Sequence, residues 1–367
     1  MADATSPLLK EIFNDERLRH IAREAAAVCP GFDSEAFLRH AGKDLDGLGI
    51  MQRMRQVATS LHATLPGGFA ANIDILRELA PRLDHSFAAI ALSEYVALYG
   101  QEHFELSMQA LADLTRHGSS EFAVRPFIAR NTARSLAIMR TWAEDDNEHV
   151  RRLASEGCRP RLPWSFQLKD LVANPEPVAP ILDALKRDPS LYVRKSVANH
   201  LNDITKDHPG WVIGKLRNWP LDDPRTAWVA KRALRTLIKN GDPQALELIG
   251  AGEAARVTID GFAVTPASVA LGERITIAAR VTSAAKDAQR LVADYAIHYV
   301  KKKGDTSRKV FKLKEFDLGP GAACELAISQ TIRDFTTRTH HPGRHRVELM
   351  VNGKVLAEAA FELDCPA

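Results

Sequence analysis

The chain has 367 residues, a formal net charge of +3 and a composition that is 45% hydrophobic and 26% charged. These values are typical of a folded, soluble protein of about two domains, and they exclude a disordered or low-complexity chain. No apolar run approaches the ~18 residues that a membrane-spanning helix needs, so we expect no membrane association.

Residues 1 to about 250 have the pattern of successive helices. The first expected helix runs from Leu8 to Ala27 after Ser6-Pro7, because apolar residues recur there at helical spacing. Acids occupy this start where a secretory signal needs a basic segment and an apolar run, so we expect no signal peptide. Short connections at Pro, Gly, Ser and Asp clusters favour an α-solenoid or bundle. Further helices are expected at residues 33–38, 49–65, 73–79, 88–99 and 104–115.

Two stretches in the helical region resemble each other, Glu144–Trp164 and Asp188–Asp203. Each continues from an acidic turn into Val-Arg followed by Arg or Lys, and Val150 and Val193 are 43 positions apart. Two-helix solenoid repeats have a period of roughly 40–47 residues. Repeats align equivalent positions along one face, so we favour a ladder of cations that follows a phosphate backbone. The alternative is that each arginine caps its helix and pairs with acids of the next repeat.

After Gly252 the pattern changes to about seven or eight short strands, several alternating with period two, which predict an immunoglobulin-like sandwich. The expected fold is therefore multidomain: an all-α region of helical repeats over residues 1–252, followed by an all-β immunoglobulin-like sandwich over residues 253–367. Residues 254–367 hold 17 Lys and Arg against 13 Asp and Glu, so the sandwich carries the net positive charge.

Three segments, HVRRLASEGCRPRLPW, VRKSVANHLNDITKDHP and SSEFAVRPFI, resemble the AlkC branch of the AlkC/AlkD DNA alkylation-repair glycosylases. The resemblance covers about Leu8 to Gly250, and it implies that residues 1–252 form an all-α solenoid of HEAT-like repeats. The sandwich resembles an immunoglobulin-like module appended in this branch. The resemblance implies a DNA glycosylase that hydrolyses the N-glycosidic bond of cationic alkylated bases, 3-methyladenine and 3-methylcytosine, in duplex DNA during base excision repair. It also implies bent DNA, with the lesion reached within or beside the stack. The competing hypothesis is a non-catalytic helical-repeat scaffold that binds nucleic acid or protein.

Three residues are the predicted catalytic groups. A base methylated at N3 is already cationic and leaves without protonation, so the site needs negative charge beside the developing sugar cation and a group that orients water. Glu121, expected at a helix start, would orient water or touch the lesion. Asp203 resembles the carboxylate that the family uses to stabilise the sugar cation. Trp164 would be an aromatic wall. The alternatives are helix-dipole complementation, a local hydrogen bond and core packing, respectively.

Further side chains are predicted to bind DNA. Arg152 occupies the family's Val-Arg-Arg position and is the preferred phosphate ligand, while Phe122 is a second candidate for the aromatic wall. Arg159 and His149 are supporting candidates. In the sandwich, Lys301, Lys302 and Lys303 open a basic hairpin that would grip the backbone and close a clamp with the solenoid. The alternative is a solvated edge hairpin whose lysines prevent strand pairing.

We expect no cofactor and no metal. His340, His341 and His345, in a second basic loop with Arg338 and Arg344, have no evident carboxylate or cysteine partner. The four cysteines have no metal-binding spacing and are expected to be reduced thiols of a cytoplasmic protein. No lysine is an obvious Schiff-base nucleophile, which predicts a monofunctional glycosylase without lyase activity. The expected partner is double-stranded DNA with alkylated bases, bound by a monomer associated with a bacterial nucleoid.

Overall fold

The computed structural model describes residues 9–335 and 339–365, and its chain divides into two compact units. The first unit contains the chain up to His208 together with Pro220–Ala233. The second contains Pro209–Trp219 and the chain from Leu234 onward. Among the described residues, no helix is both long and apolar enough to cross a membrane.

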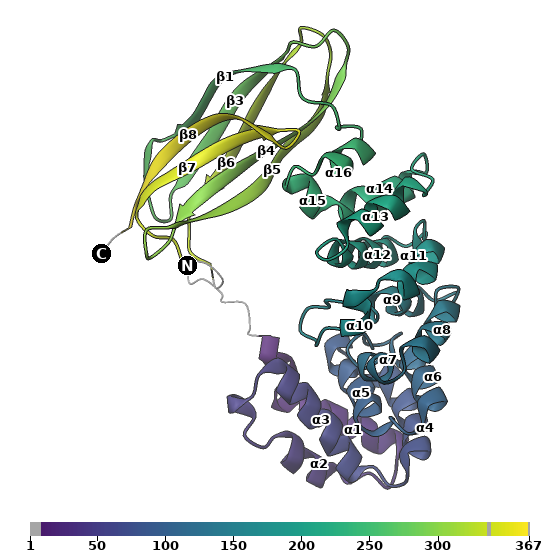
Figure 1. The fold of residues 1–367 in the computed structure, drawn as a ribbon. Coiled ribbons are helices and arrows are strands. Elements are labelled where there is room, and N and C mark those ends of the chain that lie inside the picture. Colours follow the sequence, from purple (N-terminus) through teal and green to yellow (C-terminus); the bar gives the residue numbers. More distant parts are fainter. Residues whose placement is uncertain (1–8, 336–338, 366–367) are drawn as a thin grey trace. The chain divides into compact units, whose positions relative to one another are not determined.

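The described part of the first unit is built of helices and short connections (Figure 1). Short 3-10 turns occupy Leu9–Phe13, Leu45–Gly47, Ala80–Arg82 and Glu176–Val178. The α-helices are α1 (Asp15–Val28), α2 (Ser34–Ala41), α3 (Ile50–Thr64), α4 (Phe69–Leu79), α5 (Ser86–Tyr99), α6 (Phe104–Leu114), α7 (Arg125–Arg130), α8 (Thr132–Trp142), α9 (Glu148–Glu156), α10 (Lys169–Ala173), α11 (Ala179–Leu185), α12 (Leu191–Ile204) and α14 (Pro224–Ala233).

The first helix begins later than expected. Asn14 Oδ1 accepts a hydrogen bond from the backbone N–H of Arg17, which makes Asn14 the N-cap of α1. The preceding residues form the separate 3-10 turn, and Leu8 with Ser6-Pro7 lies outside the described residues. The expectation of one helix from Leu8 to Ala27 is therefore wrong, because the pattern of apolar residues continues through a cap.

The repeat inferred from the Val-Arg segments is present in the packing. Val150 on α9 and Val193 on α12 are both fully buried, and α9 packs on α12, which packs on α14. Asn147 and Ser190 occupy equivalent N-cap positions, and each side chain accepts a backbone N–H from the second residue after it. The α-solenoid predicted from the sequence is confirmed. Helix α14 continues the stack that α9 and α12 begin.

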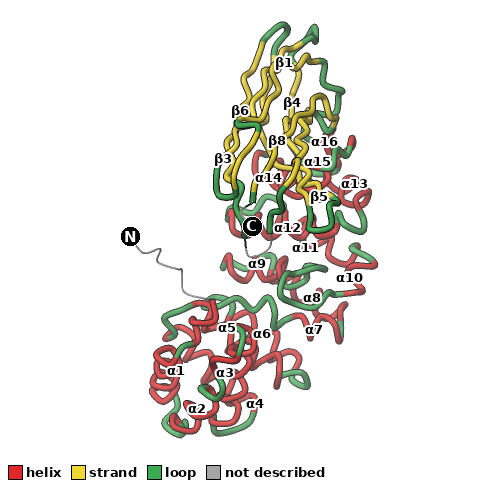
Figure 2. The backbone as a smooth tube through the Cα atoms, turned by 90° about the vertical axis from the view of Figure 1, so that its left-hand side faces the viewer, coloured by secondary structure: helices red, strands yellow, loops and turns green. Residues whose placement is uncertain are grey.

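Over its described residues, the second unit consists of the helices α13, α15 and α16 and a β-sandwich (Figure 2). One sheet has the strand order β1-β3-β6 and the other β2-β8-β7-β4-β5. All strand pairs are antiparallel except β2 with β8. The elements are α13 (Pro209–Arg217), α15 (Arg235–Lys239), α16 (Pro243–Leu248), β1 (Val257–Thr265), β2 (Ser268–Ala270), β3 (Arg274–Ser283), β4 (Gln289–Val300), β5 (Thr306–Leu318), β6 (Ala323–Thr331), β7 (Gly343–Val351) and β8 (Lys354–Asp364).

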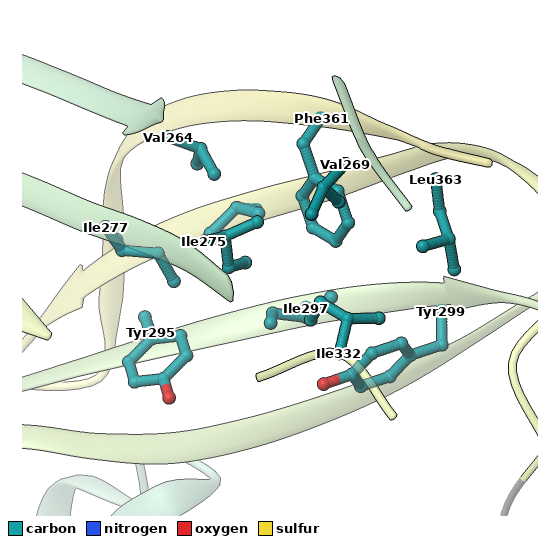
Figure 3. Close-up of a cluster of buried hydrophobic side chains, with 11 residues drawn as sticks. Val264, Val269, Ile275, Ile277, Tyr295, Ile297, Tyr299, Ile332, Phe361 and Leu363 are labelled. Atoms are coloured by element: carbon teal, nitrogen blue, oxygen red, sulfur yellow. The ribbon is translucent and has the colours of Figure 1, made fainter. Parts of the chain in front are cut away.

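The core of the sandwich is filled by side chains from both sheets (Figure 3). Ile275 and Ile277 of β3 meet Ile297 of β4 and Phe361 of β8, and all four are buried. All four cysteines are free thiols in the structure. The immunoglobulin-like sandwich is confirmed.

Two glycines join the sandwich to the helices of its own unit. Gly241 follows α15 and Gly353 lies in the β7–β8 turn, and both have positive φ. A Cβ atom on Gly241 would lie 2.9 Å from the Gly353 carbonyl oxygen, so only glycine permits this approach. Asn352 Nδ2 also donates to the carbonyl of Glu253. Packing thus groups α13, α15 and α16 with the sandwich, although helix gives way to strand only between Leu248 and Val257.

Candidate functional site

Glu121 and Arg152 form the first ion pair of a charged cluster in the first unit. Glu121 lies in a turn of residues 121–124, and α7 begins only at Arg125, so the expectation that Glu121 starts a helix is wrong. Arg152 Nη2 lies 2.6 Å from Glu121 Oε2. Ser119 Oγ donates to the same Oε2 at 2.9 Å and accepts from Arg152 Nη1 at 3.1 Å. The carboxylate is therefore held in one orientation by two donors.

Asp203 and Arg159 form the second ion pair. Arg159 approaches Asp203 Oδ2 with Nε at 2.9 Å and with Nη2 at 2.8 Å, and both residues are buried. Lys206 Nζ lies 3.5 Å from Asp203 Oδ1 and is half exposed. Burial raises the pKa of Asp203 above its ordinary value, and the Arg159 guanidinium opposes this shift.

A third carboxylate, Glu156, joins the two pairs. Its Oε1 accepts from Arg159 Nη1 at 2.6 Å and lies 3.6 Å from Arg152 Nη2. Its Oε2 accepts from Ser196 Oγ at 2.5 Å. Glu156 was not among the site residues predicted from the sequence. Its spacing carried the signal, because residues four before and three after an acid on a helix lie on the same face.

The resulting cluster contains three carboxylates and two guanidiniums in the order Glu121, Arg152, Glu156, Arg159 and Asp203. If all five groups are ionised, these side chains carry a net charge of −1. The half-exposed ammonium of Lys206 adds a positive charge at the Asp203 end of the cluster. Carboxylates fixed in a partly buried site stabilise positive charge more strongly than in water, because they need no reorganisation. The cluster is therefore suited to a reaction in which positive charge develops beside it.

Trp164 lies outside the core, on a turn after α9. Its exposed fraction is 61%, and its φ of +64° is in the left-handed region, which bulky residues rarely adopt. Trp164, Phe122 and Phe166 line a pocket of about 330 Å³ together with Arg55 and Glu94. Core packing, the alternative for Trp164, is excluded. The roles of Trp164 and Phe122 as an aromatic wall stay predictions.

A buried arginine holds the segment that carries Arg159 and Trp164. Arg125 is fully buried and donates to the carbonyls of Gly157 at 3.0 Å, Arg159 at 2.7 Å and Phe166 at 2.5 Å. Burial lowers the pKa of Arg125 to about 10, which leaves it charged at neutral pH. Arg125 lies in the SSEFAVRPFI segment, but its role was not predicted from the sequence.

Tyr192 and His149 border the cluster on the side of Arg152. The Arg152 guanidinium carbon lies 4.8 Å from the centre of the Tyr192 ring, and the ring centroids of Tyr192 and His149 are 5.5 Å apart. Burial raises the pKa of Tyr192. Arg152 is thus engaged by a carboxylate, a hydroxyl and an aromatic face, and its predicted role as a phosphate ligand stays a prediction.

Other arginines of the expected ladder have structural contacts. Arg151 donates to the carbonyls of Asp145 and Asp146 and pairs with the buried Asp188, its Nε lying 2.7 Å from Oδ2. Arg194 donates in the same way to the carbonyls of Asp188 and Pro189. Each of the two caps the turn before its own helix, as the capping alternative expects, and Arg151 also pairs with an acid of the next repeat. The ladder interpretation stays a prediction.

The basic hairpin of the second unit is the turn between β4 and β5. Lys301, Lys302 and Lys303 are exposed there, and Lys301 Nζ lies 2.6 Å from Asp305 Oδ2. The contact of these three lysines with DNA stays a prediction. The second basic loop includes Arg338, which lies outside the described residues.

One of the loop histidines has a carboxylate partner, contrary to the expectation from the sequence. His340 Nδ1 lies 3.1 Å from Asp334 Oδ1, and the buried His345 stacks on Phe361. Within the described ranges, no group of three or more His, Cys, Asp or Glu side chains could hold a metal ion.

Comparison with family models identifies both parts of the chain. Residues 48–236 match the family described as DNA alkylation repair enzyme, and residues 258–365 match the C-terminal Ig-like domain of the uncharacterised protein YhaZ. The YhaZ protein of Bacillus subtilis (strain 168) is 39% identical over 97% of this chain and 99% of its own length.

A solved structure resembles the chain over nearly its whole length. It is the Pseudomonas fluorescens alkylpurine DNA glycosylase AlkC, bound to DNA containing an abasic site analog. The identity is 55%, the alignment covers 98% of this chain and 100% of that chain, and the TM-score is 0.95.

Proposed function

Because this chain belongs to the DNA alkylation repair enzyme family, we propose that it is a DNA glycosylase that hydrolyses the N-glycosidic bond of cationic alkylated bases in duplex DNA. The observation that carries this proposal is the charged cluster, which places Glu121 and Asp203 at the two ends of one network. The 55% identity to an alkylpurine DNA glycosylase supports the same reaction class.

The two outer carboxylates, Glu121 and Asp203, would have different roles in the reaction. A cationic base leaves with the bonding electrons and needs no proton, so positive charge develops on the sugar. We assign Asp203 to stabilise that sugar cation and Glu121 to orient the attacking water. Water would donate a hydrogen bond to Glu121, whose orientation is set by Ser119 and Arg152. Trp164 and Phe122 would face the cationic base or the sugar, since aromatic faces attract cations.

The proposed substrates are 3-methyladenine and 3-methylcytosine, removed during base excision repair. The enzyme would act as a monomer without a cofactor, on DNA of the bacterial nucleoid in the cytoplasm. Arg152, Arg159 and the lysines Lys301, Lys302 and Lys303 are the proposed DNA contacts. These lysines are exposed, so their ammonium groups can reach a phosphate directly.

We propose that the enzyme has no lyase activity. A lyase needs an uncharged amine that attacks the sugar carbon, and the only lysine amine that a described contact places at the cluster is Lys206, which is ion-paired with Asp203. Borohydride should therefore trap no covalent complex with abasic-site DNA. A trapped complex that disappears in Lys206→Ala would contradict this assignment.

Release of methylated bases from duplex DNA tests the proposed function. The purified protein should release 3-methyladenine and 3-methylcytosine, and Glu121→Gln and Asp203→Asn should each slow the single-turnover rate by a factor of about 100 or more. DNA binding without release of either base would favour the non-catalytic scaffold. Release that continues at the parent rate in both variants would leave the reaction standing and refute the assigned residues.

A further inference from the structure

We propose that Glu156 is a positioning residue of this reaction, which sets how strongly the two arginines neutralise Glu121 and Asp203. This inference rests on the proposed function, because it concerns the same site. Glu156 is the shared partner of both arginines: Arg159 at 2.6 Å and Arg152 at 3.6 Å.

The place of Glu156 in the fold supports a role beyond stability. It is the last residue of α9, where the helix dipole disfavours a negative charge. Its side chain is only 7% exposed, so solvent does little to stabilise its charge. A carboxylate at a buried helix C-terminus is unfavourable unless cations surround it, and here two guanidiniums and the Ser196 hydroxyl do so.

The electrostatic consequence follows from the order of charges. Each arginine lies between Glu156 and one outer carboxylate, so its positive charge is shared by two acids. Without the Glu156 charge, Arg152 would act on Glu121 alone and Arg159 on Asp203 alone. The net charge of the five side chains would rise from −1 to zero, and the outer carboxylates would stabilise a sugar cation less well.

The same change would alter the titration of Asp203. Removing a nearby negative charge favours the ionised form, so the pKa of Asp203 should fall. The charged groups that act on Asp203 come from several elements. They are Arg125 of α7, Arg159 and Arg161 after α9, and Lys206 beside the end of α12, with Glu121 and Glu156 as the other acids of the cluster. His200 of α12 is buried and neutral, because burial lowers its pKa to about 3.

The Glu156→Gln variant removes the charge and keeps the shape. An amide oxygen at the Oε1 position can still accept from Arg159, and the amide NH2 at the Oε2 position can donate to the Ser196 hydroxyl, so the arginines should keep their places. We expect the single-turnover rate of 3-methyladenine release to fall by about tenfold or more. Undamaged duplex DNA should bind to Glu156→Gln at least as tightly as to the parent, because a negative charge has been removed. The acidic limb of the rate profile should move to lower pH.

Two further variants separate positioning from stability. Glu156→Asp keeps the charge and should restore the acidic limb toward that of the parent. Asp188→Asn removes another buried acid at the same repeat boundary, where it pairs with Arg151. Asp188→Asn should lower Tm without moving the acidic limb of the rate profile. An acidic limb that stays in place, or moves up, in Glu156→Gln overturns the proposal and leaves Glu156 a structural residue.

A readout independent of activity tests Glu156 even if no base is released. The carboxyl carbon of Asp203 can be titrated by carbon-13 NMR in the free protein, with Asp203→Asn as the assignment control. We expect a lower pKa for Asp203 in Glu156→Gln than in the parent. Failure of the parent to release base would refute the proposed function, whereas an unchanged Asp203 titration would refute the role of Glu156.

Discussion

At the scale of single residues, adjacent arginines of the same motif differ because of helix phase. Arg151 faces its own turn and Asp188, whereas Arg152 lies one position further round α9 and reaches Glu121, Ser119 and the ring of Tyr192. The first arrangement is part of the repeat, and the second orients a carboxylate. We infer that Arg152 orients Glu121 in addition to its proposed contact with a phosphate.

Arg152→Lys tests that interpretation. Lysine keeps the charge but lacks the planar fork that bonds Glu121 and Ser119 together. We expect base release to slow by about tenfold or more, while the affinity for undamaged DNA and its salt dependence stay close to those of the parent. The measurements are single-turnover kinetics and fluorescence anisotropy at several salt concentrations. If the affinity for undamaged DNA falls as much as the rate of base release, Arg152 acts mainly as the proposed phosphate ligand.

The sequence allowed Glu121, Asp203 and Trp164 to be chosen, because the reaction requires carboxylates and an aromatic wall near a recognisable motif. It did not reveal Glu156 or Arg125. A buried acid and a buried arginine on amphipathic helices look the same in sequence as solvated ones. Their importance comes from partners across repeats, such as Ser196 for Glu156, and that pairing requires the fold.

At the scale of elements, the α9 and α12 repeats are joined by polar contacts as well as by apolar packing. Ser190 Oγ donates to Glu148, Ser196 Oγ donates to Glu156, and His200 Nδ1 lies 3.0 Å from the carbonyl oxygen of Ser155. Because His200 is neutral, its Nδ1 can carry the proton that this contact needs. The cluster therefore lies on a boundary between two repeats, where a shift of one helix would misalign both ion pairs.

The turn before α7 shows how element boundaries were partly predictable. Pro126 is the second residue of α7, and proline is tolerated only in the first turn of a helix. A helix starting at Glu121 would place Pro126 in its interior. The sequence therefore held the signal that Glu121 lies in a turn. Where a side-chain cap coincided with a change of pattern, as at Asp33 before α2, the expected helix start was confirmed.

Arg125→Lys tests how the Trp164 segment is held. A lysine has a single ammonium and cannot reach the three carbonyls of Gly157, Arg159 and Phe166 together. Buried carbonyls without donors are costly, so we expect a loss of about 3 kcal/mol in the free energy of unfolding. Hydrogen exchange should increase in residues 157–166. Unchanged exchange there would show that the segment is held by its own packing.

Asp294 of β4 predicts a pH dependence of stability in the second unit. It is buried where β5 packs on α15, and burial raises its pKa from 3.8 to about 6. Lys312, Lys239 and Glu315 face it. Since the folded pKa lies above the unfolded one, the protonated carboxyl stabilises the fold at low pH. That stability is lost as the pH rises through about 6.

Asp294→Asn should therefore stabilise the protein at neutral pH. The amide resembles the protonated carboxyl and never ionises, so we expect a gain of about 2–3 kcal/mol at pH ~7 and little change at pH ~4. Denaturant unfolding at the two pH values measures it. Equal effects of the substitution at both pH values would mean that the neighbouring lysines neutralise the ionised carboxylate fully.

At the scale of the whole molecule, the order of a solenoid followed by a sandwich was predictable from periodicity alone. The grouping of α13, α15 and α16 with the sandwich was not. The packing within that unit includes the close approach of Gly241 to Gly353, two glycines that sequence reading treats as ordinary turn residues. We propose that residues 1–252 and 253–367 are nonetheless the functional modules, with the reaction in the first and a DNA contact in the second.

The lysines of the β4–β5 turn test the contribution of the second module in the full-length protein. Each phosphate that a lysine neutralises adds about 0.9 to the slope of log K against log salt. Lys301 is paired with Asp305, so Lys302 and Lys303 are expected to carry the contact. The double variant Lys302→Ala/Lys303→Ala should reduce that slope by roughly 2 and weaken binding at low salt. Tm should stay unchanged, because both side chains are exposed.

A matched control comes from the opposite end of the same sheet. Lys286 precedes β4 and Lys354 follows the β7–β8 turn, far along the strands from the lysine turn. Lys286→Ala/Lys354→Ala removes the same charge, so long-range attraction should fall equally in both double variants. A slope that falls equally in both would show that the sandwich acts through its net charge. A fall confined to Lys302→Ala/Lys303→Ala would mark the β4–β5 turn as the point that touches the backbone.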